Sequence, residues 1–238
     1  MTSRIGALSA CVVLAAVVAT PLAADAAIVI YSGSDQSATG PANKPNSDAA
    51  RASFLAALGG YDAFTTTFEE GPTGELASYD LVGGATVVST KPSVRPLTVL
   101  SASRCAFGSC GGNTTTGGSN FLDVRAAPLA FTFDAPISAF GAYFTGGDTL
   151  GIKLVFDDGT TQSILVPAVH GSTFLGFTDF GRQITAITFD PGTDFMGMDD
   201  ITFASAAVPE PMAWSLMIAG FGLAGATVRT RRRARLVA

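Results

Sequence analysis

Apart from its many carboxylates, the sequence shows no residues in a pattern that marks catalysis. His170 is the only histidine, and a histidine that precedes Gly171 in a loop is typical of an exposed turn rather than of a general base. The sequence contains no Gly-x-Ser-x-Gly elbow, phosphate-binding loop or metalloprotease helix. Its acidic residues offer many pairs for glycoside hydrolysis, although spacing along the chain does not show their separation in space. We therefore predict no catalytic residues and keep a secreted glycan hydrolase as an alternative.

Cys105 and Cys110 form the one close pair of cysteines, since the third, Cys11, lies in an apolar stretch near the N-terminus. In an oxidising compartment such a pair is expected to form a disulfide that closes a small loop. A zinc site needs three or four ligands, and no histidine lies nearby in the sequence. The pair therefore predicts a local disulfide rather than a metal site.

An uncharged segment near the C-terminus has the length of a membrane span. Met212 to Val228 would extend roughly 25 Å as a helix, because an α-helix rises about 1.5 Å per residue. A cluster of arginines follows it: Arg229, Arg231, Arg232, Arg233 and Arg235. Cationic residues stay on the cytoplasmic side of a membrane, whereas Trp214 suits the outer interface. We expect a single transmembrane helix, with the chain upstream of it outside the cytoplasm.

Several motifs stand in a fixed order around this segment. Pro209-Glu210-Pro211 comes first, Trp214 follows three positions later, and Gly220-Phe221-Gly222 lies inside the span before the arginines. The order resembles the PEP-CTERM sorting signal of Gram-negative bacteria, in its PEPxxWA variety, although Ser215 stands where that family more often has alanine. Some family schemes label the same tail as the C-terminal domain of ice-binding proteins, and that label names no activity. The resemblance covers about Val208 to Arg235.

The resemblance implies how the tail is used. In that family a membrane-embedded exosortase cuts near the Pro-Glu-Pro motif and passes the protein on to the cell surface. The implied recognition residues are Pro209, Glu210, Pro211 and Trp214, and the implied cytoplasmic stop is Arg229, Arg231, Arg232 and Arg233. A permanent membrane anchor is the alternative for a single span with a basic end.

The N-terminal segment has the three parts of a secretory signal peptide. Arg4 precedes an apolar stretch from Ile5 to Ala19, and Pro21 breaks that stretch before Ala24-Asp25-Ala26, a site for signal peptidase. Cleavage after Ala26 would release the rest of the chain on the outer side of the inner membrane. We therefore expect a precursor that is held in the inner membrane by its tail and is then moved to the cell surface or beyond.

These segments divide the chain into a signal peptide (1–26), a leading segment with a short helix (27–60), a β-structured domain (61–206) and the sorting tail (207–235). The exported part, Ala27 to Val208, has about 180 residues, a length that suits one domain with its own core. It carries 8 basic and 17 acidic residues, a formal net charge of −9, which argues against binding to nucleic acid. Its carboxylates are available for a hard cation such as calcium.

The sequence of the exported part predicts one helix near its start. After a short apolar strand, Ile28 to Tyr31, a flexible stretch rich in Ser, Gly, Asn and Pro runs from Gly33 to Pro45. A helix is predicted from Asp48 to Leu58, with Asn46 or Ser47 as its N-cap. We expect no other substantial helix in the domain, because the hydrophobic period then changes to two.

The rest of the domain reads as short strands between Gly-rich turns. The predicted strands are Thr65–Glu69, Ala85–Thr90, Leu129–Phe133, Ile137–Phe144, Gly151–Phe156, Ser163–Val166, Phe174–Thr178, Ile184–Phe189 and Met198–Phe203. Asp157-Asp158-Gly159 and Asp190-Pro191-Gly192 are the clearest turns, and Gly108 to Asn120 predict an exposed loop. Many short strands without alternating helices predict a mainly β fold, an antiparallel β-sandwich of jelly-roll type.

The strand sequences carry a second, weaker resemblance, in outline from Phe64 to Ala204. Phe68-Glu69 near the start and Met198-Asp199-Asp200 near the end look like parts of the jelly rolls of exported bacterial proteins and carbohydrate-binding modules. In such jelly rolls the acid after the first Phe and an Asp of the last strand often meet at a structural calcium ion. The resemblance nominates Glu69, Asp199 and Asp200, with main-chain carbonyls completing a shell of about six to eight oxygens. Acids that face solvent or cap a turn are the alternative.

The sequence marks no sugar-binding site. Such sites use exposed flat aromatic side chains, Trp above all, and the only Trp is Trp214 in the tail. Four tyrosines and any exposed phenylalanines remain to stack on a sugar. We therefore predict an exported, non-enzymatic protein of the cell surface or extracellular matrix, associated with biofilm exopolysaccharide and processed by exosortase. A carbohydrate-binding module is the main alternative.

Overall fold

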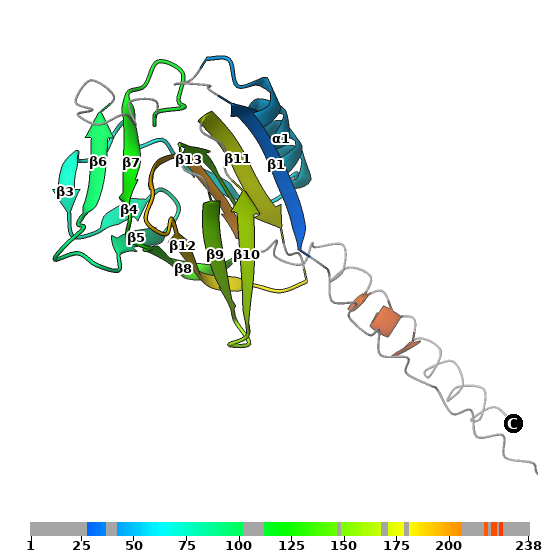
Figure 1. The fold of residues 1–238 in the computed structure, drawn as a ribbon. Coiled ribbons are helices and arrows are strands. Elements are labelled where there is room, and N and C mark those ends of the chain that lie inside the picture. The colour runs from blue at the N-terminus through cyan, green and yellow to red at the C-terminus, as the bar shows by residue number, and fades with distance from the viewer. Residues whose placement is uncertain are drawn as a thin grey trace, which may run out of the picture.

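The computed structural model describes residues 28–36, 42–101, 112–146, 149–167, 171–178 and 181–205, together with residues 217, 218, 220–222, 224 and 225. Between residues 28 and 205 the described elements are one helix and thirteen strands (Figure 1). They are β1 (Val29–Gln36), α1 (Pro45–Ala57), β2 (Ala63–Thr66), β3 (Gly74–Leu76), β4 (Tyr79–Leu81), β5 (Ala85–Ser89), β6 (Leu97–Ser101), β7 (Asn120–Arg125), β8 (Leu129–Thr145), β9 (Thr149–Phe156), β10 (Thr161–Pro167), β11 (Gly171–Thr178), β12 (Ile184–Asp190) and β13 (Phe195–Ser205). Every described strand pair is antiparallel, which confirms the predicted mainly β fold with one short N-terminal helix.

The strands form one continuous hydrogen-bonded network that folds into two layers. In the first layer the order is β4-β5-β8-β12-β9-β10. In the second it is β1-β11-β8-β13, and β13 continues to β2 along one half and to β7-β6-β3 along the other. Strand β8 belongs to both layers, because Leu129–Phe133 pair with β5 and β12, whereas Ala139–Thr145 pair with β11 and β13. The predicted β-sandwich is present, with β8 as the shared strand.

Two strands that were predicted separately, Leu129–Phe133 and Ile137–Phe144, form the single strand β8. Pro136 lies between the two paired halves of β8, a position that suits a residue without an N–H donor.

The main hydrophobic core fills the space between the layers. In it the ring of Phe140 lies 5.5 Å from that of Phe131 and 5.2 Å from that of Phe189, and all three side chains are at most 1% exposed. A strand that crosses between layers therefore also supplies the centre of the core.

Helix α1 packs on the outer face of the second layer, against β1, β11 and β8 (Figure 1). Phe54 has no exposed surface and lies over Gly141 of β8 and Gly176 of β11. A Cβ atom at Gly176 would lie 2.7 Å from Phe54 Cδ2, and one at Gly141 would lie 2.9 Å from Phe54 Cε1. Glycine is needed at both positions because the helix approaches the sheet so closely.

The helix begins at Pro45, three residues before the predicted start, and proline suits a first turn because it lacks an N–H. The first amides are satisfied by Asp35 of β1, so the prediction that Asn46 or Ser47 caps the helix is wrong. Asp35 Oδ2 accepts hydrogen bonds from the Ser47 amide (2.8 Å) and hydroxyl (2.7 Å), and Oδ1 accepts one from the Asn46 amide (3.1 Å). Burial opposes the charge on this carboxylate, but these hydrogen bonds outweigh it and hold the pKa of Asp35 below its ordinary value.

Two further boundaries differ from the prediction. Residues 33–36 belong to β1, so the flexible stretch predicted from Gly33 to Pro45 is wrong at its start. A Cβ atom at Gly33 would lie 2.2 Å from the carbonyl oxygen of Asn46, so this glycine reflects the close passage of the helix start rather than a turn. Strand β2 ends at Thr66 instead of Glu69, and Phe68 beyond it takes a left-handed φ of 63°. Strands β3, β4, β6 and β7 were not predicted.

Both predicted turns are present, with different roles. Asp157-Asp158-Gly159 closes a hairpin between β9 and β10, and the Gly159 amide donates to the Phe156 carbonyl at 3.0 Å. Gly159 has a φ of 79°, the conformation for which glycine is preferred. Asp190-Pro191-Gly192 instead carries the chain from β12 in the first layer to β13 in the second.

Both ends of the described domain lie at the same end of the second layer. Val29 pairs with Thr178, Thr178 with Ala139, and Ala139 with Ala204. This row crosses four neighbouring strands, so the start of β1 and the end of β13 are three strand spacings apart, roughly 14 Å. We call this end the terminal pole, and the end where Gln36 pairs with Gly171 the loop pole. In Figure 1 the arrow of β1 runs from the terminal pole to the loop pole.

Candidate functional site

The predicted acidic pair, Asp199 and Asp200, lies at a β-bulge in β13. Asp199 is the register partner of Tyr143 and Thr202 is that of Gly141, so β13 has one more residue than β8 between these pairs. Asp200 takes a left-handed φ of 49° there. An extra residue in one strand breaks the strict alternation of side chains between the two faces. The bulge therefore explains how two successive carboxylates contact the same loop.

That loop is the segment 112–119, which precedes β7. Asp199 Oδ2 accepts hydrogen bonds from the amides of Thr114 (2.6 Å) and Thr115 (3.2 Å). Asp200 Oδ1 accepts a hydrogen bond from the Thr115 hydroxyl at 2.9 Å. The acidic pair thus fixes the loop on the sheet through its main chain as well as its side chains.

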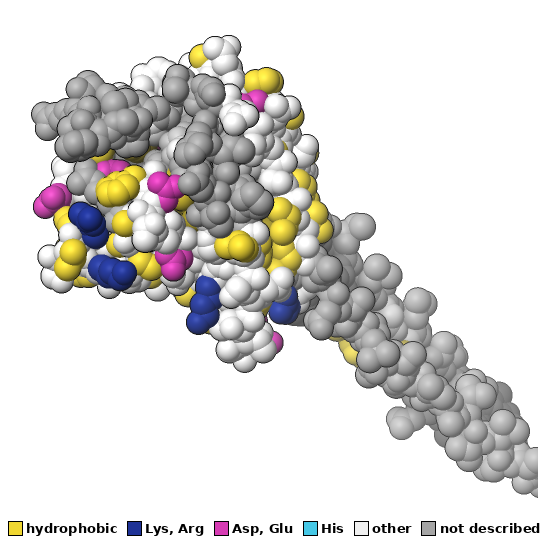
Figure 2. Space-filling model, viewed as in Figure 1, with side chains coloured by type: hydrophobic (Ala, Val, Ile, Leu, Met, Phe, Trp, Pro, Cys, Tyr) yellow, Lys and Arg dark blue, Asp and Glu magenta, His cyan; other side chains and the backbone are white. Residues whose placement is uncertain are grey.

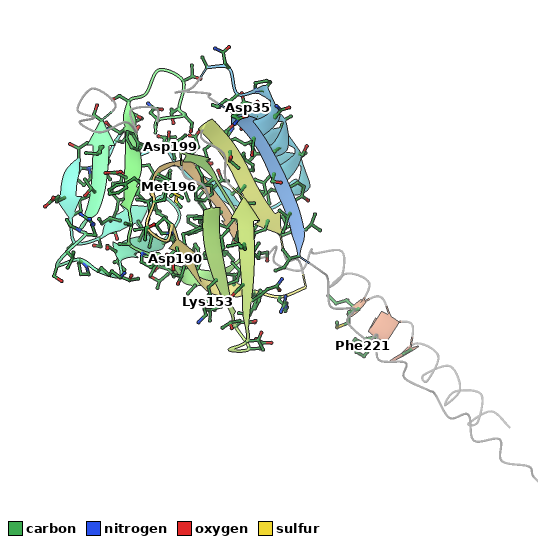
Figure 3. The ribbon with its side chains drawn as sticks, viewed as in Figure 1. Asp35, Lys153, Asp190, Met196, Asp199 and Phe221 are labelled. Atoms are coloured by element: carbon green, nitrogen blue, oxygen red, sulfur yellow. The ribbon has the colours of Figure 1, made fainter. Side chains whose placement is uncertain are left out.

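These contacts bury the first residues of the described loop. Asn113 and Thr114 are 3% and 2% exposed, so the prediction that Gly108 to Asn120 form an exposed loop is wrong for residues 112–114, whereas Thr116 and Gly117 are exposed as predicted. Asp199, labelled in Figure 3, has no exposed surface. Asp35, also labelled there, lies at the loop-pole end of β1. Buried main-chain amides need partners, and in this loop carboxylates supply them.

The titration of Asp199 differs strongly from that of an ordinary aspartate. Burial raises the pKa of Asp199 to about 7, and the neighbouring charge of Asp200 acts in the same direction. The hydrogen bonds from Thr114 and from the Asp200 amide, which lies 2.8 Å from Oδ1, favour the ionised form and offset part of this effect. Asp199 therefore titrates near neutral pH, whereas an ordinary aspartate titrates near pH 4.

Glu69 holds the other end of the same loop. Its Oε1 accepts hydrogen bonds from the amides of Ser119 (2.9 Å) and Asn120 (2.8 Å). The side-chain amide of Asn120 donates in turn to the carbonyl of Phe68 at 3.1 Å. A Cβ atom at Gly118 would lie 2.4 Å from Glu69 Oε1, so glycine at this position lets the carboxylate approach the main chain.

The three predicted calcium ligands are thus divided between two places. Asp199 and Asp200 bind residues 114–115, while Glu69 binds residues 119–120. Within the described residues there is no group of three or more Asp, Glu, His or Cys side chains suited to a metal. N–H and O–H donors already occupy carboxylate oxygens that a cation would need, so the donor set does not fit an ion as it stands. Calcium at these residues stays a prediction.

A polar cluster that sequence reasoning missed joins α1 to β8. Lys44 Nζ donates to Asp48 Oδ1 at 2.5 Å and lies 4.2 Å from the centre of the Tyr143 ring. The Tyr143 hydroxyl donates to the same carboxylate oxygen. Burial, followed by this hydrogen bond, raises the pKa of Tyr143 above its ordinary value. The i, i+4 spacing of Lys44 and Asp48 could have indicated the ion pair, but nothing in the sequence places Tyr143 beside it.

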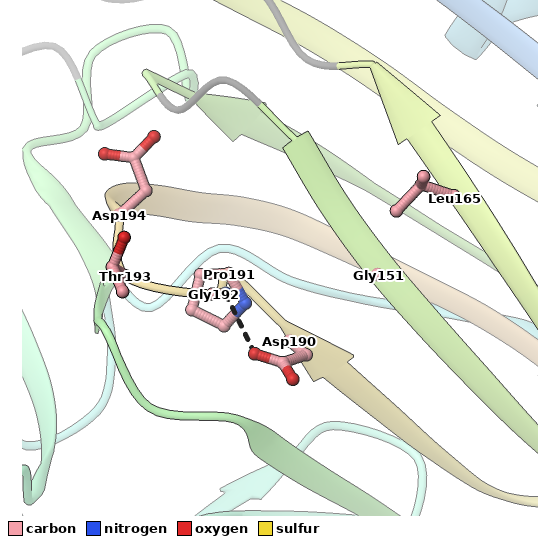
Figure 4. A pocket seen from close by; sticks show the side chains of 7 residues that line it. All are labelled: Gly151, Leu165, Asp190, Pro191, Gly192, Thr193 and Asp194. Carbon is pink, nitrogen blue, oxygen red and sulfur yellow. Dashed lines mark hydrogen bonds between the residues drawn. The ribbon is translucent and has the colours of Figure 1, made fainter.

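A pocket of about 520 Å³ lies where β9 and β10 meet the turn between β12 and β13 (Figure 4). The lining residues are Gly151, Leu165, Asp190, Pro191, Gly192, Thr193 and Asp194. Asp190 Oδ1 accepts a hydrogen bond from the Gly192 amide at 2.8 Å, and Asp194 Oδ1 accepts one from the Phe195 amide at 2.8 Å. The pocket offers carboxylates and a hydroxyl at the surface, with Leu165, which is 74% exposed, on its opposite side.

No family model matches the sequence, and no curated protein matches it. Among solved structures, a mutant of a family 29 carbohydrate-binding module complexed with cellulohexaose has 8% identity and a TM-score of 0.36, covering 60% of this chain and 92% of that chain. A mutant of the same module complexed with mannohexaose has 8% identity and a TM-score of 0.38, covering 61% and 93%. A further family 29 module has 8% identity and a TM-score of 0.36, covering 60% and 90%. Identities and TM-scores this low carry no conclusion about what this chain binds.

Exposed aromatic side chains are scarce on the described part of the domain. Tyr79 and Tyr143 are buried, and Tyr31 packs against Phe54 with ring centres 5.9 Å apart. Phe195, at 48%, is the exposed aromatic residue among those described between 28 and 205. On the face that Figure 2 shows, acidic and basic side chains are interspersed. This surface therefore presents neither an aromatic platform nor a patch of one charge.

The other predicted site residues lie outside the described residues. They are Cys105, Cys110, Pro209, Glu210, Pro211, Trp214, Arg229, Arg231, Arg232 and Arg233, and His170, for which an exposed turn was predicted, lies outside them too. The described residues of the predicted span, Met212 to Val228, are helical. In the part of the chain that the structure describes, no helix has both the length and the apolar character needed to cross a membrane.

Proposed function

We propose that this protein is an exported β-sandwich domain without catalytic activity, which reaches the cell surface or extracellular matrix by means of a removable C-terminal tail. The observation that carries the proposal is the ordered series of motifs from Pro209-Glu210-Pro211 through Trp214 to the terminal arginines. Exosortase is the partner that processes this tail, and signal peptidase is the one that removes residues 1–26.

The architecture of the domain supports removal of the tail. Strand β13 ends at Ser205, four residues before Pro209, and all described strand pairs lie between residues 29 and 205. Cleavage near the motif would therefore remove no described pairing of the sheet. A cargo that is complete before its sorting signal begins can be released without loss of stability.

The use of its carboxylates supports a non-catalytic role. Asp35 binds the start of α1, while Glu69 and Asp199 bind the loop 112–119 and the start of β7. Asp35 and Asp199 are at most 8% exposed. A general acid or a nucleophile has to reach its substrate, which these two side chains do not.

The test of sorting replaces Pro209, Glu210 and Pro211 together with alanine in a host that contains an exosortase. We expect this variant to stay in the inner membrane with its tail attached, because the recognition motif is gone. The unaltered protein and a Thr230→Ala control should be released and should lack the terminal arginines, as measured by mass spectrometry of the released form. Equal release of all three proteins would overturn the proposal.

Binding of an extracellular polysaccharide is the second candidate function, and the observation that favours it is the pocket lined by residues 190–194, which the exposed Phe195 follows in the sequence. Asp190, Thr193 and Asp194 offer hydrogen-bonding groups for hydroxyls, and Phe195 offers an exposed ring. Pull-down of the mature protein with exopolysaccharide should then be saturable and should weaken in a Thr193→Ala, Phe195→Ala double variant. Binding that is not saturable, or that the double variant retains, would leave the protein as cargo without a sugar site here.

A further inference from the structure

We infer that the terminal pole is a membrane-contact surface: while the tail is embedded, the start of β1, with the exposed side chains of Val29 and Ile30, rests on the outer leaflet of the inner membrane. The inference rests on the proposed function, because it takes residues 212–228 as a span. It adds an orientation of the domain and a lipid partner for a surface to which no role has been given.

The strand register places both membrane-directed ends of the precursor at this pole. Val29, at the start of β1, lies in the same row as Ala204, one residue before the end of β13. The predicted signal-peptide cleavage site follows Ala26, and the predicted span begins at Met212. The two hydrophobic segments therefore leave the domain from points roughly 14 Å apart on one end of one layer.

The length of the segment between β13 and the predicted span limits the orientations that the domain can take relative to the membrane. Seven residue steps lead from Ser205 to Met212 at the start of the span, and even a fully extended chain of that length reaches at most about 25 Å at 3.3–3.6 Å per residue. Strand β1, with 8 residues, is itself roughly 26 Å long. If the loop pole faced the bilayer, Ser205 would stand farther from the membrane than this connection reaches. The terminal pole therefore faces the membrane.

The side chains at this pole suit an interface with lipid. Val29 and Ile30 are 49% and 48% exposed, and they are consecutive residues at the end of an edge strand whose described partner is β11 alone. Apolar side chains of this kind gain by leaving water at the boundary between headgroups and acyl chains. Asp62 is exposed and precedes Ala63, the partner of Ala204, so the contact is made on the β1 side of the row.

The experiment uses the chain after removal of residues 1–26, with its tail intact, and its single tryptophan, so that only the tail can insert into the vesicles. A Trp214→Phe background removes the native indole, and Val29→Trp, Ile30→Trp and Gln36→Trp each introduce one reporter. Gln36 is the matched control, because it is exposed and lies at the opposite end of the same strand. Each protein is inserted into phosphatidylethanolamine–phosphatidylglycerol vesicles that contain lipids brominated near the headgroup.

The indole at position 29 or 30 should show a blue shift and a loss of emission in brominated vesicles, and the indole at position 36 should show neither. Insertion of the tail is measured separately, by flotation with the vesicles and by digestion of the arginine cluster. Chains that float but show no quenching at positions 29 and 30, or equal quenching at position 36, would overturn the orientation while the sorting tail stands. Chains that do not float would overturn the membrane tail, and the inference with it.

Discussion

Gly141 of β8 and Gly176 of β11 are register partners, and the ring of Phe54 covers both of them. We expect Gly176→Ala to lower the free energy of unfolding by about 1–3 kcal/mol, the usual cost of overpacking a core. The new methyl group would lie within 2.7 Å of the base of a ring that has no exposed surface. Chemical denaturation followed by circular dichroism measures the change.

The matched control for this prediction is Gly151→Ala. Gly151 also lies in a strand, but a Cβ atom there would meet its nearest neighbour, the Asp190 carbonyl oxygen, at 3.5 Å, an ordinary contact. Alanine at this position should change stability little or raise it slightly, because glycine loses more backbone entropy on folding. Equal losses of stability in the two variants would mean that the packing of Phe54 does not require glycine at position 176.

Asp35→Ala should destabilise the protein by about 1–2 kcal/mol at neutral pH, because the first amides of α1 lose their acceptor. The effect should depend on pH. The folded-state pKa of Asp35 lies below its unfolded value, so its stabilisation is present above about pH 4 and is lost as the pH falls through the folded-state pKa. Urea unfolding of the variant and the unaltered protein between pH 3 and pH 7 checks this, with the exposed Asp80→Asn as control. A difference in stability that is the same at every pH would contradict the ionic role of the cap.

Asp199 should give the opposite dependence. Its pKa is raised to about 7 in the folded state, so between about pH 4 and pH 7 the native protein binds more protons than the unfolded chain. Stability should therefore fall as the pH rises through this range and then level off. Asp199→Asn cannot titrate, so it should lose this slope, although its amide group also faces a donor and lowers stability at every pH. The same slope in both proteins would assign the titration elsewhere.

Calcium is tested most directly by the melting temperature of the mature protein in calcium and in excess chelator. Because N–H and O–H donors already occupy Oε1 of Glu69 and both carboxylate oxygens of Asp199, we expect no shift. A lower melting temperature in chelator that Glu69→Ala abolishes would instead establish the calcium site that the resemblance implies. Magnesium in place of calcium serves as the control for ionic strength.

Most of the strands were predictable because their hydrophobic period is local. The run from Ile184 to Phe189 and the Asp157-Asp158-Gly159 turn needed no knowledge of distant residues, and both are present. The β1 extension through Gly33 was not predictable, since a glycine in a Ser-rich stretch indicates a turn unless the passing helix is known. Strands β3 and β4, with three residues each, are too short to show a period.

The candidate site shows a similar division. The acidic residues Glu69, Asp199 and Asp200 could be selected from the sequence, but their partners could not, because Thr114 lies 85 positions from Asp199. A bulge and a left-handed residue at position 200 turn both carboxylates toward one loop, and no residue pattern signals this. The cap of α1 was missed for the same reason, since Asp35 lies 12 positions before Ser47.

Strand β8 affects how the domain unfolds, which matters while the protein is exported. Its two halves pair with β5 and β12 on one side of the sandwich and with β11 and β13 on the other. The two halves also contribute Phe131 and Phe140 to one buried core between the layers, so neither layer can melt without exposing that core, and unfolding should be cooperative, without a stable half-open form. Envelope proteases would then meet either an intact cargo or a fully denatured one, and the barrier to the second protects the protein during transit.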